Sequence, residues 1–328
     1  MLPWTESELD KILGTWQERH PQAVLLTGRE GIGLDELALE LAHALLCEKP
    51  IDGKGRACGK CVACGWFAQG NHPDFRLLQP EIFDTLTENT ENTKEKKSEQ
   101  IKIDQVRDLQ GFLSIGSHRG GRRVVVVRPA HAMNVATQNS LLKSLEEPGP
   151  GTMFLLVSGE PHRLLPTVRS RCQKLSIPKP GAAEAAAWLQ QAGAADASAQ
   201  LALAGGAPLI AAQMGDEFAS IQALVTELGN SRFDPIGVAA AFQSTPPAAF
   251  MEILYRWCHD LLSLQSAGRT RYFIQDAGTL SVLASKTSPV ALCRYLRRLA
   301  SARALAQHPL NTKLVYEELL LEYRALIA

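Results

Sequence analysis

The chain has 328 residues, of which 45% are hydrophobic and 21% are charged, and its 34 Lys and Arg residues balance 34 Asp and Glu residues. This composition excludes collagen-like, mucin-like and wholly disordered chains, and the length suits two or three domains. The formal net charge of zero gives none of the basic excess that usually marks a free-standing nucleic-acid binder. Without an apolar run of roughly 20 residues or a signal-peptide pattern, the sequence predicts a cytoplasmic protein that does not contact a membrane.

The first half of the chain alternates short apolar runs with helical patterns. Buried strands are predicted at 23–27, 74–78, 123–127 and 153–157, and helices at 35–46, 103–113 and 135–147. Strands separated by helices indicate a parallel sheet, with ligand chemistry at the carboxyl ends of its strands. Two segments between these elements read as solvated. The first is the charged stretch 88–100, predicted as a loop. The second is a basic strand edge formed by His118, Arg119, Arg122 and Arg123, which could alternatively contact DNA or an acidic neighbouring protein.

The second half of the chain is rich in alanine and contains no predicted strand. Helical segments are predicted between 182 and about 214, and later at 290–307 and 312–327. The fold class is therefore α/β plus all-α. We expect three domains, which are an α/β domain at 1–178, a small helical domain at 179–220 and a larger helical domain at 221–328.

A glycine-rich turn joins the first predicted strand to the first helix and has the glycine spacing of an ATPase phosphate-binding loop. In such loops Lys and then Ser or Thr follow the last glycine, but here Leu34 offers no ammonium and Asp35 no hydroxyl for Mg²⁺. The Asp35 carboxylate could instead cap the helix. The loop therefore resembles a degenerate phosphate site, although a turn that never held a nucleotide has the same pattern. Its key residues are Gly28, Gly31, Gly33, Leu34 and Asp35.

The third predicted strand is followed by Arg-Pro-Ala-His at 128–131, where a hydrolytic site would hold Asp-Glu. Without the Lys, the hydroxyl and both acids, no mechanism for hydrolysis is left. We therefore expect no intrinsic ATPase activity and no nucleotide bound in cis.

Four of the seven cysteines form a local group, and an odd count without an export signal argues against disulfides. Four thiolates at these spacings suit tetrahedral Zn²⁺, which would fold the segment rather than catalyse a reaction. An iron–sulfur centre is an alternative because CxxCxxC also begins the ferredoxin motif, and unligated cysteines are another. The candidate metal ligands are Cys47, Cys58, Cys61 and Cys64.

Three further segments resemble the AAA+ clamp-loader subunits of bacterial DNA polymerase III. They are LLKSLEEP at 141–148, FLLVS at 154–158 and TVRSRC at 167–172. The cysteine group, with GNHPD at 70–74, is similar to the zinc module of that family, and the degraded loop is similar to its delta-prime type. The resemblance implies an AAA+ P-loop parallel-sheet domain with an inserted zinc module, a small helical lid domain and a C-terminal helical collar domain.

The resemblance also implies roles for single residues. Arg171, next to Ser170 in the Ser-Arg-Cys motif, corresponds to an arginine finger that acts in trans on the ATP of a neighbouring subunit. Ser158 takes the polar sensor 1 position, although its hydroxyl could equally bond only the backbone. Leu209 stands where ATP-binding relatives carry the sensor 2 arginine.

The function implied is that of a stator, a non-hydrolysing subunit in a hetero-oligomeric ring with gamma or tau and delta subunits. The ring would load the sliding clamp on primed DNA as part of the polymerase III holoenzyme. The chain would act on the clamp and the primer-template DNA as part of the complex, and neighbouring subunits would bind ATP. Two alternatives are an ATP-hydrolysing motor of gamma/tau type and a zinc-dependent DNA-binding protein with an α/β scaffold.

Overall fold

The computed structural model describes residues 2–16, 20–51, 53, 55–83, 97–118, 121–215, 217–305 and 311–327. Most of the predicted charged loop, residues 88–96, lies outside these ranges, as does Arg119. The chain divides into two compact units, Met1–Pro180 and Gly181–Ala328.

The first unit is built on a parallel sheet with the strand order β2-β3-β4-β1-β5. Four strands confirm the predicted ones to within one residue at each end. The fifth, β5, was not predicted because three of its four side chains are exposed, so it lacks the apolar run of a central strand. The strands are β1 (Ala23–Thr27), β2 (Phe75–Leu78), β3 (Arg123–Val127), β4 (Thr152–Ser158) and β5 (Gln173–Ser176).

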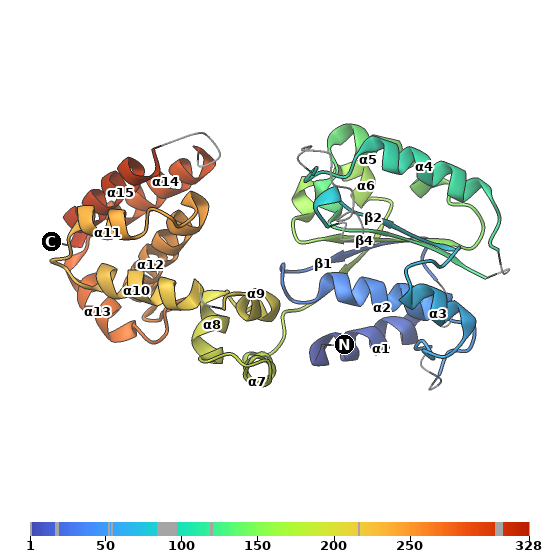
Figure 1. Cartoon of the computed structure of the whole chain (residues 1–328), viewed down its shortest axis with the longest axis horizontal. Coiled ribbons are helices and arrows are strands. Elements are labelled where there is room, and N and C mark those ends of the chain that lie inside the picture. The colour runs from blue at the N-terminus through green and yellow to red at the C-terminus, as the bar shows by residue number, and fades with distance from the viewer. Residues whose placement is uncertain are drawn as a thin grey trace, which may run out of the picture. The chain divides into compact units, whose positions relative to one another are not determined.

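Helices cover both faces of this sheet (Figure 1). One apolar cluster joins α1 and α2 to Val24 and Leu26 of β1, whereas the cluster on the opposite face joins α4 and α5 to Leu25. Successive side chains of one strand thus enter opposite layers, which is why the central strands are continuously apolar. The helices of this unit are α1 (Pro3–Trp16), α2 (Leu34–Leu46), α3 (Val62–Ala68), α4 (Ile103–Ser114), α5 (Val135–Glu146) and α6 (Pro166–Arg169), with 3₁₀ turns η1 (Glu81–Phe83), η3 (Ala130–Ala132) and η4 (Pro161–Arg163).

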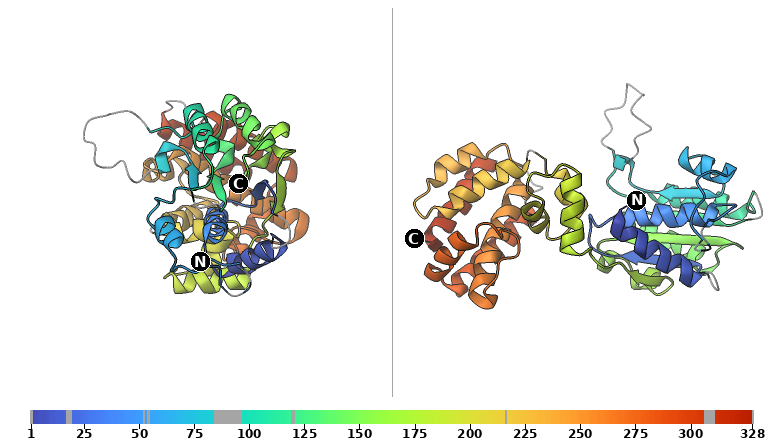
Figure 2. Two further views of the ribbon diagram at one scale, coloured as in Figure 1. Left: turned by 90° about the vertical axis from the view of Figure 1, so that its right-hand side faces the viewer. Right: turned by 90° about the horizontal axis from the view of Figure 1, so that it is seen from below.

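The described residues of the second unit form helices and no strands, as the sequence predicts (Figure 2). Helices α7 to α9 share one apolar cluster, and α10 to α15 share a larger one. None of the helices in the described part of the chain combines the length and apolar composition needed to cross a bilayer. The helices are α7 (Ala182–Gln191), α8 (Ala197–Leu203), α9 (Pro208–Gln213), α10 (Glu217–Gly229), α11 (Pro235–Ala241), α12 (Pro247–Ala267), α13 (Ala277–Lys286), α14 (Pro289–Leu305) and α15 (Thr312–Ile327).

A buried hydrogen-bond chain ties three helices of the larger cluster together. The Trp257 indole N–H of α12 donates to the Tyr323 hydroxyl of α15 at 2.7 Å, and this hydroxyl donates to the Leu228 carbonyl of α10 at 2.9 Å. Burial raises the pKa of Tyr323 well above its usual range, so the hydroxyl stays protonated. The Trp257 N–H, the Tyr323 hydroxyl and the Leu228 carbonyl thus all have a hydrogen-bond partner, as is usual for buried polar groups.

We expect Tyr323→Phe to destabilise the protein by about 1–3 kcal/mol, because it leaves the Trp257 N–H and the Leu228 carbonyl buried without a partner. Equilibrium urea unfolding measures the change. Tyr255→Phe is the matched control, since the half-buried Tyr255 hydroxyl makes no hydrogen bond within the described residues, and its effect should stay within about 0.5 kcal/mol. Equal losses in the two variants would contradict the assigned role of the hydrogen-bond chain.

Candidate functional site

The glycine-rich loop follows β1 at its carboxyl end and leads directly into α2, as predicted, but its interior is apolar. The Leu34 side chain is only 6% exposed. A Cβ placed on Gly28 would lie 3.1 Å from Leu34 Cδ2 and 3.0 Å from Ile32 Cδ1. Leu34 therefore packs inward across the loop, where a nucleotide-binding loop would offer an ammonium group.

The N-terminal helix α1 holds the loop from the other side. The Trp4 indole N–H donates a buried hydrogen bond of 2.7 Å to the Ile32 carbonyl. A Cβ on Gly33 would collide with Leu2, and its φ of +92° is also unfavourable for other residues. The sequence offered no motif for these contacts, because Trp4 belongs to a helix that the apolar pattern did not predict and Leu2 directly precedes it.

Asp35 does not cap α2, so the predicted role of its carboxylate is wrong. The helix is preceded by Gly33, with no side-chain cap, and Asp35 is already the second helical residue. Asp35 Oδ2 instead lies 3.8 Å from Arg128 Nη1, just after β3. Burial raises the pKa of Asp35, and the Arg128 charge opposes that rise. An acid–base pair thus occupies the two positions where a hydrolytic site would place its magnesium ligands.

The sensor 1 position at the end of β4 is also engaged within the chain. Ser158 is fully buried, and its Oγ lies 3.2 Å from His131 Nδ1. The same Oγ accepts a hydrogen bond of 3.2 Å from the Glu160 N–H. Burial lowers the pKa of His131, so the ring is neutral around pH 7. Leu209, the residue expected in place of the sensor 2 arginine, lies in α9 of the second unit.

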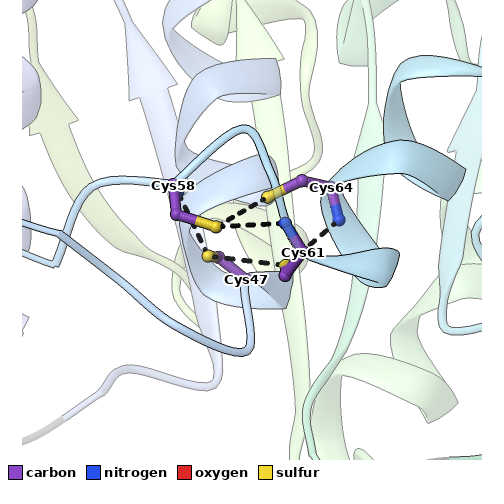
Figure 3. A group of neighbouring side chains, drawn as sticks. All are labelled: Cys47, Cys58, Cys61 and Cys64. Atoms are coloured by element: carbon purple, nitrogen blue, oxygen red, sulfur yellow. Dashed lines mark hydrogen bonds between the residues drawn. The ribbon is translucent and has the colours of Figure 1, made fainter.

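The four predicted metal ligands converge on one point (Figure 3). Their sulfur atoms all lie within 4.8 Å of one another, with 4.0 Å between Cys47 and Cys61 and 3.9 Å between Cys58 and Cys64. A metal–sulfur bond of about 2.3 Å gives a tetrahedron with edges of about 3.8 Å. In a multi-iron cluster the four sulfurs are divided between two or four irons, which spreads sulfurs on different irons further apart. The group therefore fits a single tetrahedral ion.

Local backbone geometry prepares these sulfurs for a cation. Cys47 follows α2 directly, and Cys61 precedes α3 and accepts the Cys64 N–H at 3.4 Å. The N–H groups of Lys60 and Cys61 lie 3.4 and 3.3 Å from Cys58 Sγ. These two donors lower the pKa of Cys58, whereas burial raises the pKa of Cys64. N–H groups aimed at sulfur favour the thiolate, which is the form that binds metal.

Arg171 and Ser170 follow the short helix α6 and are both exposed. Arg171 Nη1 donates to the Thr167 carbonyl at 2.9 Å, and Ser170 Oγ donates to the same carbonyl at 3.1 Å. Arg171 Nη2 forms an ion pair with Glu146 at the end of α5. The sequence placed Glu146 in the LLKSLEEP segment but gave no indication of this pairing.

The interpretation of the basic group before β3 as a solvated edge is wrong for Arg123. This side chain is buried, and its Nη1 donates to the carbonyls of Phe112 and Leu113 at 3.1 and 2.9 Å. Arg123 therefore satisfies the last carbonyls of α4, which have no partner within the helix. Arg122 remains half-buried, with Nη1 3.0 Å from His20 Nδ1.

Two family profiles match the chain. The profile described as DNA polymerase III, delta subunit, matches residues 7–181, and the profile of its C terminal matches residues 219–325. A solved structure of a DNA polymerase III gamma subunit-related protein from Thermotoga maritima aligns with a TM-score of 0.50 and 19% identity, covering 99% of this chain and 100% of that one. This likeness concerns the fold alone, and it agrees with the AAA+-like class expected from the sequence.

Curated relatives carry the name DNA polymerase III subunit delta'. Identity is 44% with the protein of Pseudomonas aeruginosa and 34% with that of Escherichia coli, each over 190 residues, or 58% of this chain and 52% of the relative. With the Bacillus subtilis protein, identity is 28% over 273 residues, or 79% of this chain and 77% of the relative. The chain thus spans about half the length of the first two relatives.

Proposed function

The chain belongs to the DNA polymerase III delta subunit family, and we propose that it serves in a clamp loader as a subunit of delta-prime type that does not hydrolyse ATP. The observation that carries this proposal is the filled glycine-rich loop. Leu34 occupies its interior, Leu2 and the α1 residue Trp4 contact it from the other side, and an Asp–Arg pair takes the place of the magnesium ligands. The lysine and the hydroxyl residue that follow the last glycine of a nucleotide-binding loop, and serve the phosphates and Mg²⁺, are replaced by Leu34 and Asp35.

The exposed Arg171 supports a role at a neighbouring subunit. A subunit without a site of its own can offer this guanidinium to the ATP of the next one, where an arginine supplied in trans stabilises charge on the γ-phosphate. Ser170 lies beside it on the same short turn. The ring would hold gamma or tau and delta subunits, with ATP on the neighbours. The chain would act on the sliding clamp and primed DNA only as part of this complex, in the bacterial cytoplasm.

The division into an α/β domain at 1–178, a lid at 179–220 and a collar at 221–328 belongs to the same proposal. Two apolar clusters, one in α7–α9 and one mainly in α10–α15, support the distinction between lid and collar, with Leu203 of α8 packing into the larger cluster. Residue 220 itself lies inside α10. A boundary before this helix would therefore keep α10 whole and together with α11–α15.

We propose that the cysteine group holds one structural Zn²⁺. Four sulfur ligands leave no open coordination position for catalysis, and the described residues between Cys47 and Cys61 form no helix and only one isolated β-bridge, so the ion would fix their path. The same chemistry would let the group close the segment without a disulfide in a reducing compartment.

The purified chain should carry one zinc ion, and Cys58→Ser should lose it, because a serine hydroxyl is a poor substitute for a thiolate. Elemental analysis and the visible spectrum of the cobalt-substituted protein measure the content and the tetrahedral sulfur coordination. Cys293→Ser is the control, since Cys293 is exposed and outside the group. An iron absorption spectrum, or zinc retained by Cys58→Ser, would refute the zinc assignment.

The isolated chain should bind ATP with a dissociation constant above about 1 mM, because the loop interior is occupied by Leu34 and Ile32. Titration with a fluorescent ATP analogue tests this, with an ATP-hydrolysing gamma subunit as the positive control. Micromolar binding or turnover by the chain alone would favour the motor alternative. Tight, salt-sensitive binding to duplex DNA would favour the DNA-binding alternative.

Arg171→Ala should slow the DNA- and clamp-stimulated ATPase of a ring reconstituted with gamma and delta subunits, without impairing assembly. An arginine in trans is worth about 10³–10⁵ in rate in GTPases, so the ATP site that depends on Arg171 should fall nearly silent and the ring should keep only the rate of its other sites. Arg169→Ala, an equal loss of charge two residues away and also exposed, is the control. Full activity of the Arg171→Ala ring would leave only the scaffold role.

A further inference from the structure

The Arg171 guanidinium is held at two of its edges by two different elements. Nη2 pairs with the Glu146 carboxylate at the last residue of α5, and Nη1 donates to the Thr167 carbonyl in α6 at 2.9 Å. The Arg171 side chain is nevertheless 34% exposed, and that of Glu146 is 47% exposed. The arginine is thus fixed in orientation while part of its head faces solvent.

A guanidinium has enough donors to bind partners in its own chain and an anion at the same time. Arginine carries five N–H groups in one rigid plane, and the two contacts of Arg171 engage two of them. Three donors remain for the oxygens of a phosphate. Because the plane is fixed by its partners in the chain, less side-chain freedom is lost when those three donors meet an anion.

The pair also leaves the positive charge of Arg171 available. An ion pair between half-exposed side chains contributes little in a high dielectric, so the Glu146 carboxylate does not neutralise Arg171 for a more highly charged partner. The neighbouring Glu147, also exposed, makes no ion pair within the described residues. Of these two adjacent carboxylates, that of Glu146 is paired with Arg171, and that of Glu147 is not paired with it within the described residues.

We infer that Glu146 is the positioning residue of Arg171, presenting its guanidinium in one orientation to an anionic phosphate on an adjacent subunit. The inference rests on the proposed function, since it assigns Glu146 a part in the action of Arg171 in trans. Glu146 itself touches no reacting atom and acts only through the arginine.

The test uses complete reconstituted rings that carry Glu146→Gln, with Glu147→Gln as the matched control on the next residue. Glutamine keeps the size of the side chain but weakens the contact, so kcat of the clamp- and DNA-stimulated ATPase should fall by about two- to fivefold. KM for ATP should stay unchanged, because the interaction is needed mainly in the transition state. Glu146→Asp, which keeps the charge, should retain more of the rate than Glu146→Gln, and Glu147→Gln should match the wild type.

A double variant separates positioning from a merely structural role. Glu146→Gln should add no further loss to an Arg171→Ala ring, whereas an independent structural role would lower the rate of both backgrounds equally. The inference is overturned if Glu146→Gln rings are as fast as the wild type, or if neither Glu146 variant assembles. It is also overturned if the Glu146→Gln rings are faster, because Glu146 would then keep the arginine away from the phosphate. An Arg171→Ala ring with full activity would overturn the proposed finger together with the inference, whereas a slow Arg171→Ala ring beside an unaffected Glu146→Gln ring would remove the inference alone.

Discussion

The inward packing of Leu34 is the contact on which the character of the first unit depends. It places an apolar side chain at the first position of α2, against Gly28 and Ile32, in the space that a phosphate-binding loop leaves to its ligand. The strand, the turn and the helix remain in the order of a nucleotide-binding fold. Side chains of the protein pack against this loop, and Leu2 and the α1 residue Trp4 add to the same contact. The scaffold can therefore persist without the chemistry that such a loop usually serves.

The polar residues near the carboxyl ends of the strands follow the same logic. Asp35 faces Arg128, and the buried Ser158 faces His131, so that each of these groups has a partner from the chain itself. Arg171 also has a partner in the chain, and the exposed fractions of the Arg171 and Glu146 side chains, 34% and 47%, are close to those of Arg128 and Asp35, 25% and 45%. The proposed action of Arg171 on another molecule therefore rests on its place in the Ser-Arg-Cys motif and not on exposure alone.

Helix α2 connects the two features that the sequence singled out. The degenerate loop precedes its first residue, and Cys47 follows its last. Cys47 meets the negative end of the dipole of α2, so a cation in the cysteine group would relieve the repulsion of its thiolate. The degenerate loop and the cysteine group thus lie at opposite ends of one helix.

The sequence by itself determined the central strands, the helical second half and the cysteine group. Apolar runs such as 123–127 and the spacing of Cys58, Cys61 and Cys64 are local properties, and local properties can be identified without the fold. The absence of a lysine after Gly33 was equally plain.

Only the tertiary structure decided which partners the polar and edge residues take. It placed the exposed strand β5 beside β1, turned Asp35 towards Arg128 rather than the helix end, and buried Arg123 under α4. It also brought Arg171 to Glu146, 25 residues earlier, and Trp4 to Ile32, 28 residues later. A charged or edge residue carries no periodic pattern, and its partner is fixed by how distant segments pack. The sequence alone thus showed that the loop lacks the lysine and the hydroxyl of a nucleotide site, whereas only the fold showed that Leu34 and Ile32 pack inside it.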